Sequence, residues 1–199
     1  MSRIAYILMF LIGGAVGQGT QVQQSARVPT RIVSRRYGFS METPTGWRAS
    51  ITTPGGLPLL INFDWKELQG KSGVNFLPKG GAMIAVQSED GLPQPNGSYS
   101  LDEWADFDER SASSEAMLRD FEMPTSTGVD RALSLSFDGP NDGSDIQQQH
   151  DVNVYWQFHG HRFATRLTYA VGDPNGKAYV KTLETLVRSI RPVAAPGGR

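Results

Sequence analysis

The sequence has 199 residues, with 19 Lys and Arg against 20 Asp and Glu, and no cysteine. This balance leaves no basic excess of the kind that binds nucleic acid, so nucleic acid is not an expected partner. Without cysteine there are no disulfides and no lipoprotein anchor, because that anchor is attached to a cysteine. The core alone must stabilise the fold, and the chain is long enough for one domain.

The first residues have the three parts of a secretory signal peptide. A basic start at 1–3 precedes an uncharged apolar run at 4–16, and the small residues Ala15 and Gly17 fit the positions that signal peptidase requires. The alternative is a membrane anchor, but the uncharged run is shorter than the roughly 20 residues that span a bilayer. We therefore expect a cleaved signal peptide at 1–17 and a secreted or periplasmic protein with no membrane span after cleavage.

Both ends of the mature chain are expected to be irregular. Residues 18–36 are rich in Gln, Ser and Thr, which is typical of a flexible leader, although 31–33 could pair with the domain. Residues 193–199 are mostly Pro, Gly and Ala and are expected to form a disordered tail. The folded domain is thus expected to cover 37–192.

Alternating apolar residues predict four strands in the first part of the domain, at 37–41, 47–51, 57–63 and 82–86. Pro44 and Gly46 predict a turn between the first two strands, which would make them a β-hairpin. Residues 64–79 have no clean period and are expected to form a loop with one turn of helix.

A helix is predicted to begin after Ser100. Ser100 and Glu103 have the spacing of a capping box, in which each side chain accepts a hydrogen bond from the backbone of the other. The acidic residues that follow favour the positive end of the helix dipole. We expect this helix to run from about 101 to 118.

Three more strands are predicted at 132–137, 152–158 and 163–169. If His159 and Gly160 form a two-residue turn, the last two strands pair in a register that places apolar or β-branched residues opposite one another. Tyr155 and Arg166 would then lie on the other face of the sheet. The expected cross-strand pairs are Trp156 with Phe163, Val154 with Thr165 and Val152 with Leu167.

The last predicted element is a helix that begins at Asp173 and Pro174 and stops at Pro192. Its apolar residues form one stripe: Tyr179, Leu183, Leu186, Val187 and Ile190. Strands, a helix, three strands and a helix together predict an α+β fold, with helices packed on an antiparallel β-sheet.

This layout resembles the PsbP-like superfamily, which includes the extrinsic protein of photosystem II, a nuclear Ran-binding factor and bacterial envelope proteins. The resemblance rests on the aromatic opening strand at 37–39, Pro44-x-Gly46-Trp47, the capped helix at 100–103 and the closing helix that ends at 186–192. It implies an α/β/α sandwich that binds proteins or small ligands without catalysis. It transfers no active-site residues, because the family has no shared ones.

The residues that could carry chemistry have plainer interpretations. His150, His159 and His161 are too far apart along the predicted strands to form one metal site. Residues 138–145 are rich in oxygen ligands but lack the spacing of a calcium loop and suit a long turn. The acidic run Asp102, Glu103, Asp106, Asp108 and Glu109 could include a carboxylate pair, but it fits the solvated face of a helix.

The sequence has no Gly-x-Ser-x-Gly motif and no phosphate-binding glycine loop. We therefore predict no catalytic, cofactor-binding or metal-ligating residue and no cofactor. The aromatic residues Phe63, Trp65 and Phe76 either pack on the sheet edge or form a binding surface. The expected function is a non-catalytic binding or assembly module for another envelope or extracellular protein or a small ligand. The alternative is a hydrolase-like envelope enzyme with a scattered active site.

Overall fold

The computed structural model describes residues 31–51, 57–68, 77–89, 99–112, 116–141 and 146–193. The expected signal peptide, most of the leader and the end of the tail lie outside these residues. Within the described part of the chain, no helix is both long and apolar enough to cross a membrane.

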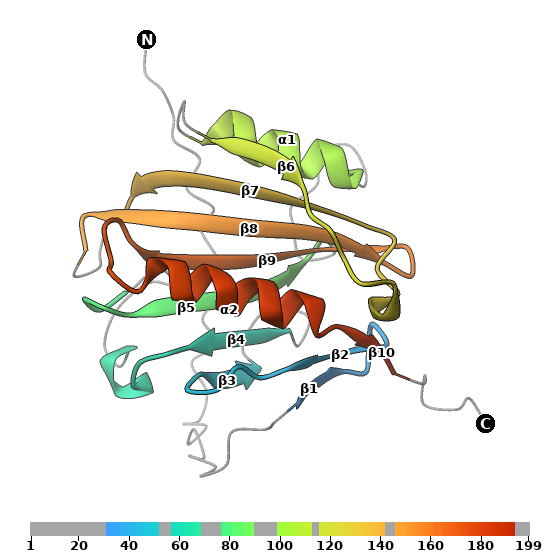
Figure 1. The fold of residues 1–199 in the computed structure, drawn as a ribbon, viewed down its shortest axis with the longest axis horizontal. Helices are drawn as coiled ribbons and strands as arrows, with labels where there is room; N and C mark the ends of the chain where they lie inside the picture. The colour runs from blue at the N-terminus through green and yellow to red at the C-terminus, as the bar shows by residue number, and fades with distance from the viewer. Residues whose placement is uncertain are drawn as a thin grey trace, which may run out of the picture.

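Seven antiparallel strands form the main sheet (Figure 1). All strands predicted from residue 57 onward are present, and β6 is an addition to them. In their order across the sheet, the strands are β3 (Arg48–Ile51), β4 (Pro58–Ile61), β5 (Ala82–Ser88), β9 (His161–Ala170), β8 (Gln148–Phe158), β7 (Arg131–Pro140) and β6 (Met117–Asp120).

A second, three-stranded sheet is formed by β1 (Arg31–Ser34), β2 (Phe39–Glu42) and β10 (Arg191–Pro192). β1 lies in the expected leader, at the residues 31–33 that were expected to be able to pair with the domain, and it pairs with β2. The hairpin predicted between β2 and β3 is wrong, because these strands belong to different sheets. The reason is packing: the Phe39 ring contacts the rings of Trp156 and Phe163, so β2 covers the main sheet.

The two α-helices of the described residues pack on opposite faces of the main sheet. α1 (Leu101–Ser111) buries Leu101, Trp104 and Ala105 against β7, β8 and β9. α2 (Gly176–Arg188) lies on the other face, in front of β9 and β5 in Figure 1. The protein therefore has the expected α+β fold, with helices on both sides of an antiparallel sheet.

The capping box at the start of α1 is confirmed. Glu103 N donates to Ser100 Oγ, and Ser100 N donates to a Glu103 carboxylate oxygen. The predicted end of this helix is wrong, because α1 stops at Ser111 and residues 117–120 form the edge strand β6. The sequence carries a strong start signal here but no glycine or proline to mark the end.

The predicted register of the β8–β9 hairpin is confirmed. Trp156 lies opposite Phe163, and the two other predicted pairs are also present. His159 and Gly160 both have positive φ, 49° and 79°, as a two-residue type I′ turn requires.

α2 has the predicted apolar stripe from Tyr179 to Val187, but it begins two residues later than expected and ends at Arg188, before Ile190 and the predicted stop at Pro192. Asn175 precedes its first turn, and the Asp173 carboxylate accepts a hydrogen bond from Asn175 N. The predicted loop at 64–79 includes one turn of 3-10 helix, η1 (Trp65–Leu68). Leu77, beyond it, is fully buried against Ile61 and Met83 of the main sheet.

The main sheet is buried on both of its faces, and the candidate site lies on one of them. Trp156 faces α2 and Tyr155 faces α1, and each side chain is completely buried. Alternate side chains of β8 therefore lie in two different buried environments, rather than on one buried and one solvated face.

Candidate polar binding site

A row of polar side chains lies on the α1 face of the main sheet. Along β8 these are Gln149, Asp151, Asn153 and Tyr155, which alternate with the apolar residues of the α2 face. On β9, Arg166 lies opposite Asn153 and Thr168 lies opposite Asp151. Most of these groups are buried, so each needs a hydrogen-bond partner or an opposite charge.

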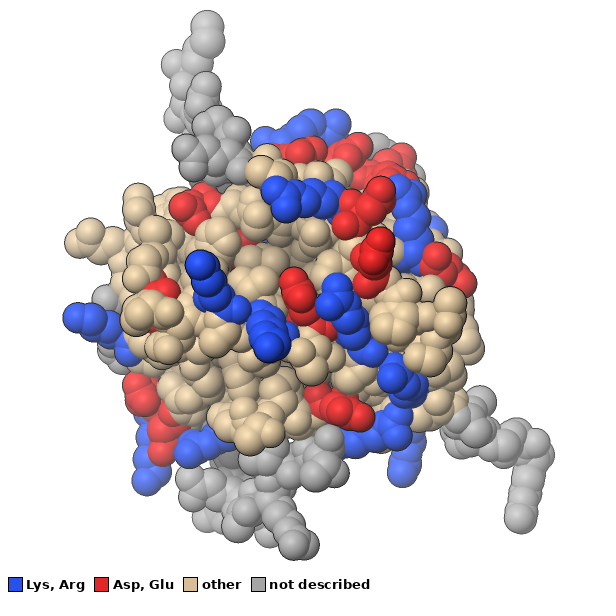
Figure 2. Space-filling view, viewed as in Figure 1, with Lys and Arg blue, Asp and Glu red and all other residues tan. Residues whose placement is uncertain are grey.

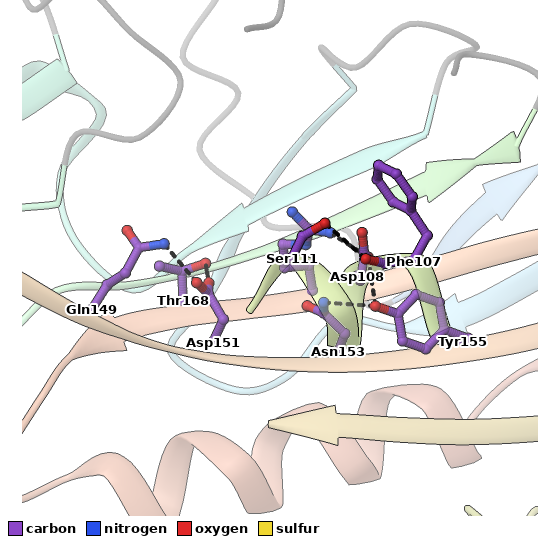
Figure 3. Close-up of polar contacts among 9 residues, drawn as sticks. Phe107, Asp108, Ser111, Gln149, Asp151, Asn153, Tyr155 and Thr168 are labelled. Atoms are coloured by element: carbon purple, nitrogen blue, oxygen red, sulfur yellow. Dashed lines mark hydrogen bonds and ion pairs between the residues drawn. The ribbon is translucent and has the colours of Figure 1, made fainter. Parts of the chain in front are cut away.

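Asp108 reaches this row from α1. Leu101, Trp104, Ala105 and Asp108 have the i, i+3, i+4, i+7 spacing of one helix face, so the face that buries the first three also points Asp108 at the sheet. Figure 3 shows its carboxylate directed toward Tyr155. The prediction that the acidic run is a solvated face holds for Asp102, Glu103 and Asp106, which are exposed, and is wrong for Asp108.

Four of these residues form one hydrogen-bonded group. Tyr155 OH donates to Asp108 Oδ2 over 2.6 Å, and Arg166 Nη2 donates to the same oxygen over 3.1 Å. Asn153 Nδ2 donates to Tyr155 OH over 3.0 Å. Asp108 is therefore held by a charge and a hydroxyl at once, and it joins α1 to β8 and β9.

A second group lies further along β8 (Figure 3). The Asp151 carboxylate accepts hydrogen bonds from Thr168 Oγ1 (2.5 Å) and Gln149 Nε2 (2.6 Å). The Gln149 carbonyl in turn accepts from Asn141 Nδ2 over 2.6 Å. These bonds fix Asp151 between two strands, at 4% exposure.

Burial and charge shift the pKa values of the cluster. Burial raises the pKa of Asp151 above its usual value, although Arg166 and the hydrogen bond from Thr168 oppose the shift. Burial also raises the pKa of Tyr155 well above its usual value, and the nearby Asp108 adds to this. Burial disfavours the charged form of Arg166, but Asp108, Tyr155 and Asp151 outweigh it, so the pKa of Arg166 is raised and the guanidinium stays charged.

Three buried polar atoms on this face have no hydrogen-bond partner among the described residues. They are Asn153 Oδ1, Arg166 Nε and Gln87 Oε1. Gln87 lies on β5 and faces the same side as Ala85, which is opposite Arg166. The atoms come from β5, β9 and β8, which are neighbours in the sheet.

The three histidines do not converge. His159 and His161 are exposed at the β8–β9 turn, as expected. His150 lies near the other end of β8, on the α2 face, where its Nδ1 is 2.5 Å from Asp138 Oδ1 on β7. In the described ranges no group of three His, Asp or Glu could hold a metal ion.

The other candidates fall partly outside the described residues. The long turn predicted at 138–145 begins later than expected, because 138–140 belong to β7. Asn141 is buried and bound to Gln149, and 142–145 lie outside the described residues. Phe63 packs against the apolar cluster that includes Leu77, whereas Phe76 lies outside the described residues. The face toward the viewer in Figure 2 carries Lys and Arg interspersed with Asp and Glu, in keeping with the balanced composition.

No protein-family model matches this sequence, and no curated protein matches it either. Three solved structures are among those to which this chain is similar. A protein of Bacteroides thetaiotaomicron is 14% identical with a TM-score of 0.47; the match covers 85% of this chain and 50% of that one. The chain thus spans about half the length of the Bacteroides protein.

Two further structures match over most of their own length. A protein of unknown function from Pseudomonas aeruginosa is 14% identical with a TM-score of 0.40, and the match covers 74% of this chain and 89% of that one. CyanoP, the PsbP of the cyanobacterium Synechocystis, is 12% identical with a TM-score of 0.43, over 90% of this chain and 99% of its own. A PsbP structure is among those to which this chain is similar.

Proposed function

We propose that this protein is exported from the cytoplasm and acts as a non-catalytic binding or assembly module. Export is supported by the signal-peptide features of residues 1–17. Binding is supported by one structural observation above all: on the α1 face of the main sheet, Asp108 is paired with Arg166 while three buried hydrogen-bonding atoms have no partner among the described residues.

The state of the charged groups favours binding over catalysis. Asp108 is held by Tyr155 and Arg166, and Asp151 by Thr168 and Gln149. A general acid or base must exchange a proton with a substrate, which groups saturated by fixed partners are poorly placed to do. A fixed polar cluster with unpartnered donors and acceptors instead suits a binding role.

Export is tested by fractionation of the native host. The mature protein should be recovered outside the cytoplasm, with an N-terminus near Gln18 or Thr20. Recovery of an uncleaved chain in the membrane fraction would contradict this part of the proposal.

Binding is tested by affinity purification of the tagged protein from its native envelope under non-denaturing conditions. A partner or ligand should copurify with the wild type, be lost with Arg166→Gln and be retained with Arg119→Gln, which changes an exposed arginine on β6. Equal recovery with both variants would place the binding surface elsewhere. A broad hydrolase screen on the same preparations should give no turnover.

The second candidate function is a hydrolase-like enzyme, and one observation favours it. The Asp138 carboxylate engages His150 Nδ1, the arrangement that orients an imidazole as a general base, and Ser136 lies two residues before Asp138 on the same strand face. If this pair is catalytic, a hydrolase activity found in the screen should disappear with His150→Gln. An activity that survives this change would exclude the pair.

A further inference from the structure

The methionines among the described residues differ widely in their exposure to solvent. Met41 and Met83 belong to the core, at 0% and 8% exposure, and Met123 is half-buried. Met117, the first residue of β6, is 48% exposed. Oxidation of a thioether requires that the oxidant reach the sulfur, so susceptibility follows exposure. Met117 is therefore the described methionine that a dissolved oxidant reaches most readily.

The place of Met117 in the sheet keeps its side chain accessible. β6 is the edge strand of the main sheet and pairs with β7 alone. Ser136 lies opposite Met117 on the same face, and its side chain is too small to cover a methionine. Met117 belongs to none of the three buried clusters, so an oxygen added to its sulfur does not have to enter the core.

Arg119 supplies a second feature of this position. It lies two residues further along β6, so its side chain shares a face with that of Met117. Its guanidinium is directed at the thioether: Nε donates to Met117 Sδ over 2.8 Å, and Nη2 contacts the same sulfur. A thioether sulfur is only a weak acceptor, whereas oxidation makes the side chain polar and gives it an oxygen. The guanidinium therefore gains a better acceptor when the sulfur is oxidised.

We infer that Met117 is a reversible oxidation site, at which a hydroperoxide converts the thioether to a sulfoxide and Arg119 then donates to the new oxygen. Both side chains are exposed, so the guanidinium can withdraw to make room for the oxygen. Methionine has three rotatable side-chain bonds, which allow the oxygen to turn toward the guanidinium. This inference goes beyond the proposed binding function and does not depend on it.

The oxidation is a two-electron oxygen transfer. The sulfur lone pair of Met117 attacks one oxygen of the hydroperoxide, so that an S–O bond forms and the O–O bond breaks. The proton of the transferred hydroxyl passes to the leaving oxygen, which departs as water or an alcohol. The sulfur is oxidised and the peroxide is reduced. The reverse reaction belongs to the methionine sulfoxide reductases, which use thiols as the reductant.

The first test follows the oxidation of each methionine separately. The folded protein is treated with dilute hydrogen peroxide, quenched at intervals and analysed by mass spectrometry of its peptides. The sulfoxide of Met117 should form on the order of tenfold faster than those of Met41 and Met83, and also faster than that of Met123. In urea, where the chain is unfolded, the four rates should become similar. Equal rates in the folded protein would overturn the inference.

The second test concerns the role of Arg119. Once Met117 is oxidised, the NMR signal of the Arg119 Nε–H should shift, and its exchange with solvent should become slower. Met117→Leu is the control, because peroxide should leave the Arg119 signal of this variant unchanged. A signal that does not respond to complete oxidation of Met117 would show that Arg119 does not bind the oxygen.

The third test concerns reversibility. Reductases for both sulfoxide epimers, added with a thiol to the folded oxidised protein, should restore the thioether of Met117 and the original Arg119 signal. A sulfoxide that is reduced only after unfolding would contradict a reversible surface site. The oxidised protein should also unfold at the same urea concentration as the untreated protein, since Met117 lies outside the core clusters. A large loss of stability would mean that the oxidation reaches the core.

Discussion

Asp108 shows how one side chain can join a helix to two strands that are distant from it in sequence. It lies on the buried face of α1, and its carboxylate accepts from both Tyr155 on β8 and Arg166 on β9. Removal of one member of a largely buried charge pair, such as Asp108 and Arg166, leaves the other charge uncompensated, which destabilises more than the pair itself stabilises. Arg166 and Tyr155 would both lose a partner if Asp108 were truncated.

We therefore expect Asp108→Ala to lower the free energy of unfolding by about 2–4 kcal/mol, measured by urea denaturation. Asp106→Ala is the control, because Asp106 lies on the same helix and is exposed. Its effect should stay within about 0.5 kcal/mol. Similar losses from both variants would show that the carboxylate acts through the helix alone and not through Arg166.

Tyr155 and Trp156 provide a second prediction at the residue scale. Because each is completely buried on its own face of the sheet, Tyr155→Ala and Trp156→Ala should both lower the free energy of unfolding by about 3–5 kcal/mol. Tyr155→Phe keeps the ring but removes the hydroxyl between Asn153 and Asp108, so its loss should be about 1–2 kcal/mol. A loss from Tyr155→Ala well below that from Trp156→Ala would mean that the α1 face is hydrated.

At the scale of elements, α1 depends on its first turn because its last turn has no comparable motif. Ser100→Ala removes one half of the capping box and should destabilise the protein by about 1 kcal/mol. Ser111→Ala is the control at the exposed end of the helix and should change the free energy of unfolding by less than about 0.5 kcal/mol. Urea denaturation of both variants checks this, and equal effects would argue against the cap.

Local signals in the sequence predicted most elements of this fold, whereas their long-range pairing could not be predicted. The β8–β9 register follows from a two-residue turn and matched alternation, both of which are local. The partner of β2 depends on contacts between Phe39 and residues more than a hundred positions away, so the nearby turn at Pro44 and Gly46 suggested the wrong pairing. The end of α1 was missed because no residue there marks it.

The candidate site could be predicted only in part for the same reason. Asp108 has the helical spacing of a buried residue relative to Leu101, and this signal was available in the sequence. The polar residues of β8 instead have the pattern of a solvated strand face. That Asn153 and Asp151 are buried follows only from long-range packing on that face, such as the packing of α1 on Leu133, Tyr155 and Ala164.

At the scale of the whole molecule, two buried sheet faces stabilise the protein unequally. The α2 face is largely apolar, whereas the α1 face buries a carboxyl, Asp151, whose charged form burial disfavours. The pKa of Asp151 is raised above its usual value of 3.8, so the folded state binds its proton more tightly than the unfolded state does. By linkage, this carboxyl reduces stability progressively as the pH rises from about 4 through its folded pKa.

Two variants with opposite expected signs test this contribution. Asp151→Asn removes the charge. The free energy of unfolding of this variant, relative to that of the wild type, should therefore be higher near pH 7 than near pH 4. Thr168→Val removes a hydrogen bond that stabilises the carboxylate and should therefore destabilise more near pH 7 than near pH 4. Urea denaturation at both pH values measures the differences. If neither difference changes with pH, Asp151 has the same proton affinity in the folded and unfolded states. If only the Asp151→Asn difference changes in the reverse direction, the hydrogen bonds of Asp151 outweigh its burial and lower its pKa.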